Sequence, residues 1–245
     1  MTMGALREEL RRATEDEAIE GVASFRGTVD RPYETPLPED DPVLLLERRL
    51  AESERERGPD HHDTLVATSN LGGVCQEAGH LDRAVSLFER TLAAAERVLG
   101  PGHVDTLTFC NNLASGYAAA GDPGRAIPLY ERALAGRERV LGPDDLRTRL
   151  CRDNLARAHE LAGNPARAVP LHRRTLADRE RILSPGHPYT LLSRCELAHA
   201  HHAAGDEERS AELFQRTLAD SERLFGPDHA ATRNVRALLA HVRGG

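Results

Sequence analysis

The chain of 245 residues contains no lysine and no tryptophan, and aromatic residues make up only 4% of it. All 32 of its basic residues are arginine. The absence of lysine excludes a Walker-type phosphate loop, a Schiff-base lysine and a Ser–Lys dyad, since each needs an ammonium group at a fixed place. With so few aromatic side chains, any core must be built mainly from Ala, Leu and Val.

The sequence also lacks long apolar runs and a basic surface. No stretch reaches the ~18 apolar residues of a membrane span, and residues 1–9 carry no apolar run of a signal peptide. The net charge of −7 comes from residues 1–60, which hold 16 acidic and 9 basic residues, while the remainder holds 23 of each. Because acidic and basic residues are equal in number over residues 61–245, this part has no excess of positive charge that would attract DNA, RNA or anionic lipid. We expect a cytoplasmic protein with neither a nucleic-acid nor a membrane partner.

Known catalytic signatures are missing as well. There is no G-x-S-x-G, no Gly-rich phosphate loop, no Cys–His signature and no paired-carboxylate motif. The four cysteines show no C-x-x-C spacing and are interpreted as reduced, small hydrophobic residues. The sequence therefore predicts no cofactor and no catalytic residue, and it does not favour an enzyme.

What is present is a repeat of 42 residues. Gly-Pro pairs begin at positions 58, 100, 142 and 226, and Ser184-Pro185 keeps the same step. Two further series with this spacing are Gly79, Gly121, Gly163, Gly205 and Leu71, Leu113, Leu155, Leu197, Leu239. A register held over five copies indicates a repeat architecture.

Each period contains two helical patterns. Leu107, Leu113 and Tyr117 mark one buried stripe, and a second stripe follows a short turn. Gly121 suits the left-handed position that ends the first helix, and Asp122 can cap the second. The unit is therefore a helical hairpin, with a first helix (A) and a second helix (B), that must stack on its neighbours to bury its stripes.

We predict an all-α, right-handed α-solenoid over residues 42–245. It consists of an unpaired B helix at 42–57, hairpins at 61–98, 103–140, 145–182 and 187–224, and a terminal helix at 229–242. Residues 1–41 leave the register and form a separate acidic arm, helical near 15–25 and extended over 27–42. Because an uncapped solenoid end exposes apolar surface, we expect this arm to cover the open end of helix 42–57.

The pattern resembles the tetratricopeptide repeat family. The residues that carry the resemblance are Leu71-Gly72, Leu113-Ala114, Leu155-Ala156 and Leu197-Ala198 in the A helices, with Ala84/Phe88 and Ala126/Tyr130 in the B helices. The period of 42 and the stretches Asn111-Asn112-Leu113-Ala114 and Leu99-Gly100-Pro101 look like the kinesin light chain subfamily. That variant also occurs in bacterial proteins, often beside nucleotide-binding signalling domains. The resemblance covers about 58–245 and implies that the A helices line a concave groove.

The resemblance also implies that the residue before the conserved leucine faces this groove. Here that residue is Asn70, Asn112, Asn154 and then Glu196. A ladder of side-chain amides offers donors and acceptors that suit an extended peptide backbone. The alternative is that these asparagines brace neighbouring helices. Other groove candidates are Asn111, Ser115, Asp153, Arg157 and His199, among which Arg157 could meet an acidic residue of a peptide.

The histidines suggest a second kind of site. Glu196, His199 and His202 share one face of a helix and could form a three-ligand metal site, although solvated side chains are the simpler interpretation. His61, His103, His187 and His229 recur every 42 residues, with Asp145 in the remaining copy. Their periodicity points to the geometry of the linkers rather than to catalysis.

Three functions remain open at this point. The first is a non-catalytic adaptor that binds a peptide or partner helix in the groove. The second is a regulatory or accessory subunit of a bacterial biosynthetic or signalling assembly, acting through the acidic arm, with self-association through the arm or the solenoid ends. The third is a helical-repeat enzyme or metal-binding protein that uses Glu196, His199 and His202.

Overall fold

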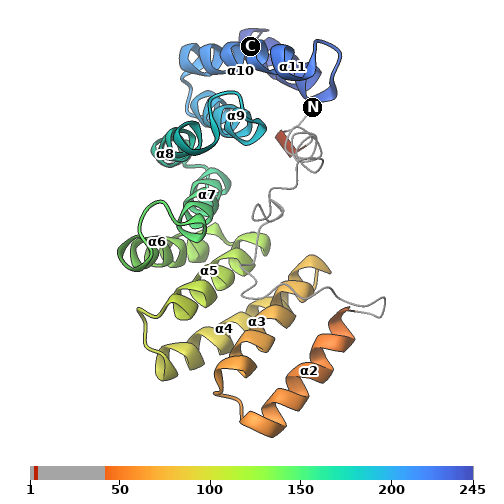
Figure 1. Cartoon of the computed structure of the whole chain (residues 1–245), viewed down its shortest axis with the longest axis vertical. Coiled ribbons are helices and arrows are strands. Elements are labelled where there is room, and N and C mark those ends of the chain that lie inside the picture. The colour runs from red at the N-terminus through yellow and green to blue at the C-terminus, as the bar shows by residue number, and fades with distance from the viewer. Residues whose placement is uncertain (1–2, 5–41, 245) are drawn as a thin grey trace. The chain divides into compact units, whose positions relative to one another are not determined.

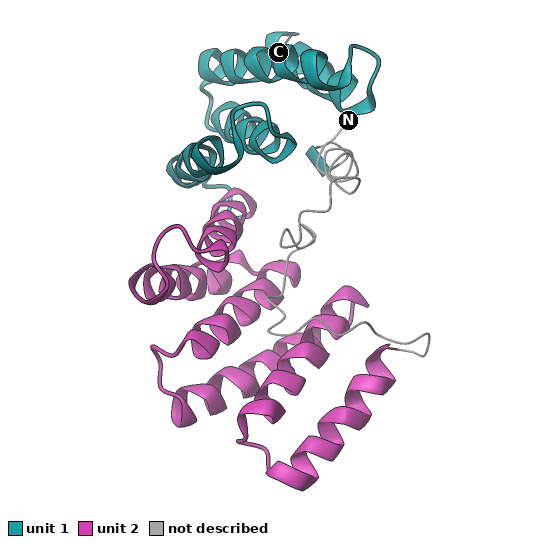
Figure 2. Cartoon of the chain, viewed as in Figure 1, with its two compact units in different colours: residues 1–26, 162–245 teal, residues 27–161 magenta. Residues whose placement is uncertain are grey.

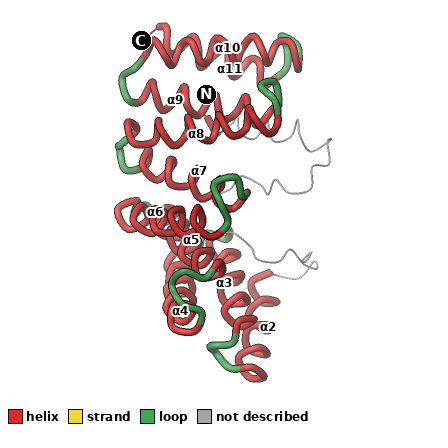
Figure 3. The backbone as a smooth tube through the Cα atoms, turned by 60° about the vertical axis from the view of Figure 1, so that its left-hand side comes forward, coloured by secondary structure: helices red, strands yellow, loops and turns green. Residues whose placement is uncertain are grey.

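The computed structural model describes residues 3–4 and 42–244 (Figure 1). Over residues 42–244 the chain is helical, with loops but no strand between the helices (Figure 3). None of these helices combines the length and apolar character that crossing a membrane requires. The helices are α2 (Pro42–Arg57), α3 (His62–Glu77), α4 (Leu81–Val98), α5 (Val104–Ala119), α6 (Pro123–Val140), α7 (Leu146–Leu161), α8 (Pro165–Leu183), α9 (Pro188–Ala203), α10 (Glu207–Phe225) and α11 (Ala230–Gly244).

The helices keep the 42-residue register of the sequence, since α3, α5, α7 and α9 begin at residues 62, 104, 146 and 188. The turn inside the hairpin has the expected glycine and capping aspartate in the second and fourth hairpins, whereas His80 and Asn164 at the corresponding positions make no side-chain capping bond. Gly121 ends the A helix with φ +79°, and the side chain of Asp122 accepts a hydrogen bond from the backbone amide of Arg125 at 3.0 Å. Four of the five junctions between hairpins have a glycine with φ near +88°. The fifth junction has Ser184, the non-glycine residue there, with φ +91°.

The histidines that recur every 42 residues cap the A helices. The ring Nδ1 of His61, His103, His187 and His229 accepts a hydrogen bond from the backbone amide two residues later, each at 3.2 Å. Asp145 replaces histidine in the third copy and accepts the corresponding bond from the amide of Arg147 at 2.9 Å. The prediction of a role in linker geometry is confirmed.

The chain forms two compact units, which Figure 2 distinguishes by colour: residues 27–161, and residues 162–245 together with 1–26. The expected domain over 42–245 thus contains parts of both units. In the unit of residues 27–161, consecutive helices between α2 and α7 pack against one another. Its A helices also meet directly, since α3 contacts α5 and α5 contacts α7.

In the unit of residues 162–245, the core lies among α9, α10 and α11. It contains Phe214, Val235 and Leu239, and the partly buried Met3 packs against it. The predicted arm over residues 1–41 lies outside the described residues, apart from residues 3 and 4. Its expected contact with α2 therefore stays a prediction.

All four cysteines are buried thiols, and none forms a disulfide within the described residues. Burial raises the pKa of the Cys110 thiol to about 11 and that of Cys195 to about 12. Because desolvation disfavours the thiolate, both side chains remain neutral thiols at physiological pH.

Candidate functional site

The polar residues predicted to line a groove fall in both units. In the unit of residues 27–161 they belong to α3, α5 and α7. Two side-chain hydrogen bonds join α3 to α5 there: Asn112 donates to the hydroxyl of Ser69 at 3.0 Å, and Gln76 donates to Ser115 at 3.1 Å. Asn112 is fully buried. Its contact with Ser69 is the bracing arrangement that the sequence left open beside peptide binding.

Two other asparagines on these helices keep unsatisfied polar atoms. The side-chain oxygen of Asn70 and both polar atoms of the Asn111 side chain are buried and make no hydrogen bond to any described residue. Asn70 is half-buried as a residue, whereas Asn111 is 1% exposed. A buried amide group without a partner costs about 1–3 kcal/mol, so these atoms mark a place where a ligand could supply the missing bonds.

The third A helix of this unit, α7, carries the remaining candidates. Asp153 and Asn154 are buried, and Arg157 is half-buried. Of these three, Arg157 is therefore the one whose side chain reaches solvent most readily.

The candidates on α9 belong to the unit of residues 162–245. Glu196 is buried and His199 is half-buried. His202 pairs with Glu207 at 2.7 Å and lies edge-on to the ring of His241, with 5.5 Å between the ring centroids. Nowhere among the described residues do three or more His, Cys, Asp or Glu side chains gather closely enough to hold a metal ion.

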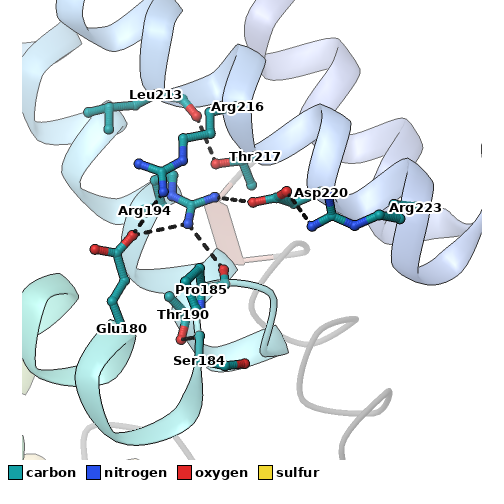
Figure 4. Close-up of polar contacts among 10 residues, drawn as sticks. All are labelled: Glu180, Ser184, Pro185, Thr190, Arg194, Leu213, Arg216, Thr217, Asp220 and Arg223. Carbon is teal, nitrogen blue, oxygen red and sulfur yellow. Dashed lines mark hydrogen bonds and ion pairs between the residues drawn. The ribbon is translucent and has the colours of Figure 1, made fainter.

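The sequence did not reveal a set of buried arginines. Arg194 on α9 is fully buried, and its guanidinium donates to Asp220 at 2.6 Å, to Glu180 at 3.2 Å and to the carbonyl oxygen of Pro185 at 3.1 Å (Figure 4). This set of contacts is called the arginine clamp below. It ties α9 to α8, to α10 and to the junction that precedes α9.

The arginine clamp recurs at the same position of other repeats. Arg152, 42 residues earlier, is fully buried, donates to the carbonyl oxygen of Pro143 at 3.3 Å and lies 3.7 Å from Glu138. Arg236, 42 residues later, bonds Pro227 and Glu222 in the same way on an exposed surface. In the first two hairpins this position holds Thr68 and Cys110. The signal was present in the sequence as arginine at a position of the buried stripe that holds Cys110 in the second hairpin.

A pocket of about 230 Å³ lies beside Thr68, between α3, α4 and the junction that precedes α3. Its lining includes the apolar Leu65 and Ala94 and the two arginines Arg90 and Arg97. Both arginines are paired, Arg90 with Glu54 at 3.2 Å and with the hydroxyl of Thr68 at 3.4 Å, and Arg97 with Asp60 at 2.5 Å.

Comparison with protein families matches most of the chain to models of the tetratricopeptide repeat. One model matches residues 45–97, 63–139 and 104–181, and a second matches residues 190–231. These matches include every helix except α11 in whole or in large part. None of the curated proteins compared with the chain matches it.

Several solved structures are similar to this chain, and two of them are of a putative kinesin light chain. The Podospora anserina putative kinesin light chain with nearly identical TPR-like repeats is similar with a TM-score of 0.68 and 25% identity, covering 91% of this chain and 96% of that one. A variant of that protein with a single substitution gives the same TM-score and identity and is covered to 95%. BtubC (BKLC) from P. vanneervenii has a TM-score of 0.61 at 18% identity, with 91% and 90% covered.

Proposed function

Because the chain belongs to the tetratricopeptide repeat family, whose fold is typical of protein-interaction modules, we propose that it binds an extended peptide along α3, α5 and α7. The observation that carries the proposal is the set of unpaired polar atoms on Asn70 and Asn111. A polypeptide backbone offers both N–H donors and carbonyl acceptors, and an asparagine amide complements both. Recognition through backbone groups is also independent of the peptide's sequence.

The order in which the peptide makes its contacts follows from exposure. Asn70 is half-buried and can be reached first, while Asn111 is 1% exposed and comes into contact only when the peptide seats closely. Asn112 acts as a brace, since its donor already serves Ser69. The half-buried Arg157 supplies a positive charge on the same unit, which favours an acidic residue in the peptide.

The test uses a peptide selected from a random display library against the full chain. Replacing Asn111 with Leu should abolish binding of that peptide, measured by calorimetry, and should raise the free energy of unfolding because an unsatisfied buried amide is removed. The matched control is Asn164→Leu, at an exposed position whose side chain makes no capping bond. Undiminished affinity in the Asn111→Leu protein would refute the proposed contact.

A regulatory role through the acidic arm is the second proposal. It rests on Met3, which packs against the core of α9–α11. Met3→Asp should weaken that contact and change self-association, measured by analytical ultracentrifugation. An unchanged sedimentation profile would count against this role.

A further inference from the structure

The residues around the pocket beside Thr68 and the residues around Arg194 occupy equivalent positions of two different hairpins. Residues 126 apart occupy equivalent positions, three repeats of 42 from one another. Six of the nine positions around the pocket carry the same residue type in both hairpins. In the first hairpin they are Pro59, Leu65, Arg90, Thr91, Ala93 and Arg97.

The other three positions differ: Asp60 stands where the later hairpin has Gly186, and the remaining two form an ion pair in the later hairpin only. Arg194 and Asp220 in the later hairpin correspond to Thr68 and Ala94 in the first. Arg194 is fully buried and bonds Asp220 at 2.6 Å, so that pair fills the space between α9 and α10. Thr68 and Ala94 are both much smaller, and a pocket of about 230 Å³ remains.

Acceptors that serve Arg194 also have counterparts beside the pocket. Arg194 donates to the carbonyl oxygen of Pro185, and the equivalent Pro59 lies on the wall of the pocket. Glu180 accepts from Arg194 and also lies 3.5 Å from Arg216, so one carboxylate serves two guanidinium groups. The equivalent Glu54 pairs with Arg90, the counterpart of Arg216.

If a guanidinium occupied the pocket, the pocket and the site of Arg194 would contain the same number of arginine-type cations and carboxylates. Around Arg194 there are two further arginines, Arg216 and Arg223, and two carboxylates, Glu180 and Asp220. Around the pocket there are also two arginines and two carboxylates, because Asp60 pairs with Arg97 where Asp220 pairs with Arg223. A third guanidinium in the pocket would therefore meet the same number of charges as around Arg194, with the difference that Asp60 is half exposed and Asp220 is largely buried.

We propose that the pocket beside Thr68 binds a guanidinium group, in the place that the side chain of Arg194 occupies in its own hairpin. The group would donate hydrogen bonds to the carbonyl oxygen of Pro59 and to the carboxylate of Glu54, and its alkyl stem would pack on Leu65 and Ala94. The ligand is either a small guanidine compound or an arginine side chain of a partner protein. The site shares no residue with Asn70 and Asn111, so it is independent of the peptide proposal.

The experiment is a titration of the isotopically labelled full chain, followed by NMR shifts of Leu65, Thr91 and Ala93. The probes are capped arginine, capped lysine, capped glutamate and ethylguanidine. Capped arginine should shift these resonances, and capped lysine should not, because an ammonium lacks the planar fork of donors. Equal binding of ethylguanidine would assign the site to small guanidine compounds, and tighter binding of capped arginine would assign it to a partner's side chain.

Two variants copy the later hairpin. Thr68→Arg supplies the guanidinium internally and should abolish the shifts, with helicity by circular dichroism showing that the protein is folded. Ala94→Asp restores the second carboxylate and should tighten binding of capped arginine about tenfold, as one added charge-assisted bond would. Ala135→Asp adds the same charge at an exposed position of α6 and should leave the affinity unchanged.

Three results would overturn the proposal. One is the absence of shifts with capped arginine and ethylguanidine in both the wild type and the Ala94→Asp protein. Another is equal binding of capped lysine, which would reduce the site to a preference for positive charge. The third is selective binding of capped glutamate, which would show that Arg90 and Arg97 bind an anion and that the pocket does not bind a guanidinium.

Discussion

The hairpin of α3 and α4 and the hairpin of α9 and α10 are built from the same repeat but are held together differently. In the first, the space between the helices is lined by Thr68 and Ala94 and is partly empty. In the second, the buried Arg194 fills it and bonds Asp220 and Glu180. The comparison teaches that a repeat can exchange an internal ion pair for a pocket while its length and register stay the same.

The largest expected effect comes from removing the arginine clamp. Arg194→Ala leaves Asp220 and Glu180 without their buried partner and should lower the free energy of unfolding by about 3 kcal/mol. Chemical denaturation measures it. The control is Arg236→Ala, whose arginine makes the equivalent contacts on an exposed surface and should cost less than about 1 kcal/mol.

A double substitution sharpens the same comparison. Arg194→Thr combined with Asp220→Ala reproduces the first hairpin, and it should be less destabilising than Arg194→Thr alone because no unpaired carboxylate of Asp220 remains. If the two substitutions simply added, the ion pair would not account for the difference between the hairpins.

The next largest change in the free energy of unfolding is expected from the junctions that precede the two hairpins. Ser184 holds φ +91° before α9, where the equivalent Gly58 holds φ +88° before α3. With ψ 156°, Ser184 lies in a region of backbone conformation that is essentially restricted to glycine and costs another residue about 1–3 kcal/mol. Ser184→Gly should therefore raise the free energy of unfolding by about 1 kcal/mol, and Gly58→Ser should lower it by a similar amount. Thermal unfolding of both variants checks the pair, and a shift of the same sign in both would contradict it.

The start of the B helix differs as well. Asp206 caps α10, accepting from the backbone amide of Arg209 at 3.3 Å, whereas His80 at the start of α4 makes no capping bond. Burial acts to raise the pKa of Asp206, but that hydrogen bond and the charges of Arg209 and His201 hold it below its usual value. The cap therefore stabilises the fold above the carboxyl's unfolded pKa, and this contribution is lost as the pH falls through the lower folded pKa.

His80→Asp should install the missing cap on α4. We expect the free energy of unfolding at pH 7 to rise by about 1 kcal/mol, and the gain to disappear in acid. Denaturation at pH 7 and pH 3 measures both. A gain that persists unchanged at pH 3 would show that the carboxylate is not its source.

The smallest difference should appear in the reactivity of the buried thiols. Cys75 on α3 and Cys195 on α9 are both fully buried, and burial raises the pKa of Cys195 to about 12. A thiol reagent reaches each one only when its hairpin opens locally. Because the arginine clamp closes the later hairpin, Cys195 should be modified more slowly than Cys75, as followed by mass spectrometry. The order should reverse in the Arg194→Ala protein.

The sequence predicted the positions of the helices because their punctuation is local. Gly121 and Asp122 act on the backbone within a few residues, and the histidine caps act on the amide two residues ahead. Spacing alone therefore located them. Ion pairs also join successive B helices, as between Arg132 and Glu96 at 2.5 Å.

The interior contacts could not be predicted in the same way. Asn112 stands at the position expected to face a groove, yet it is fully buried and bonds Ser69 on the preceding A helix. The sequence does not single out Arg194, because a charged side chain is rarely buried unless it is paired. Its partners Glu180 and Asp220 come from two other helices, and only their arrangement in space shows that the charge is compensated.

The equivalence of Thr68 and Arg194 has a consequence for protein engineering. The hairpin of α9 and α10 carries a buried arginine and its aspartate, and the first hairpin shows that smaller residues at these two positions leave an opening of ligand size without any insertion or deletion. A designer could in this way choose which module of a helical-repeat array is hollow and which is solid, by two substitutions per module.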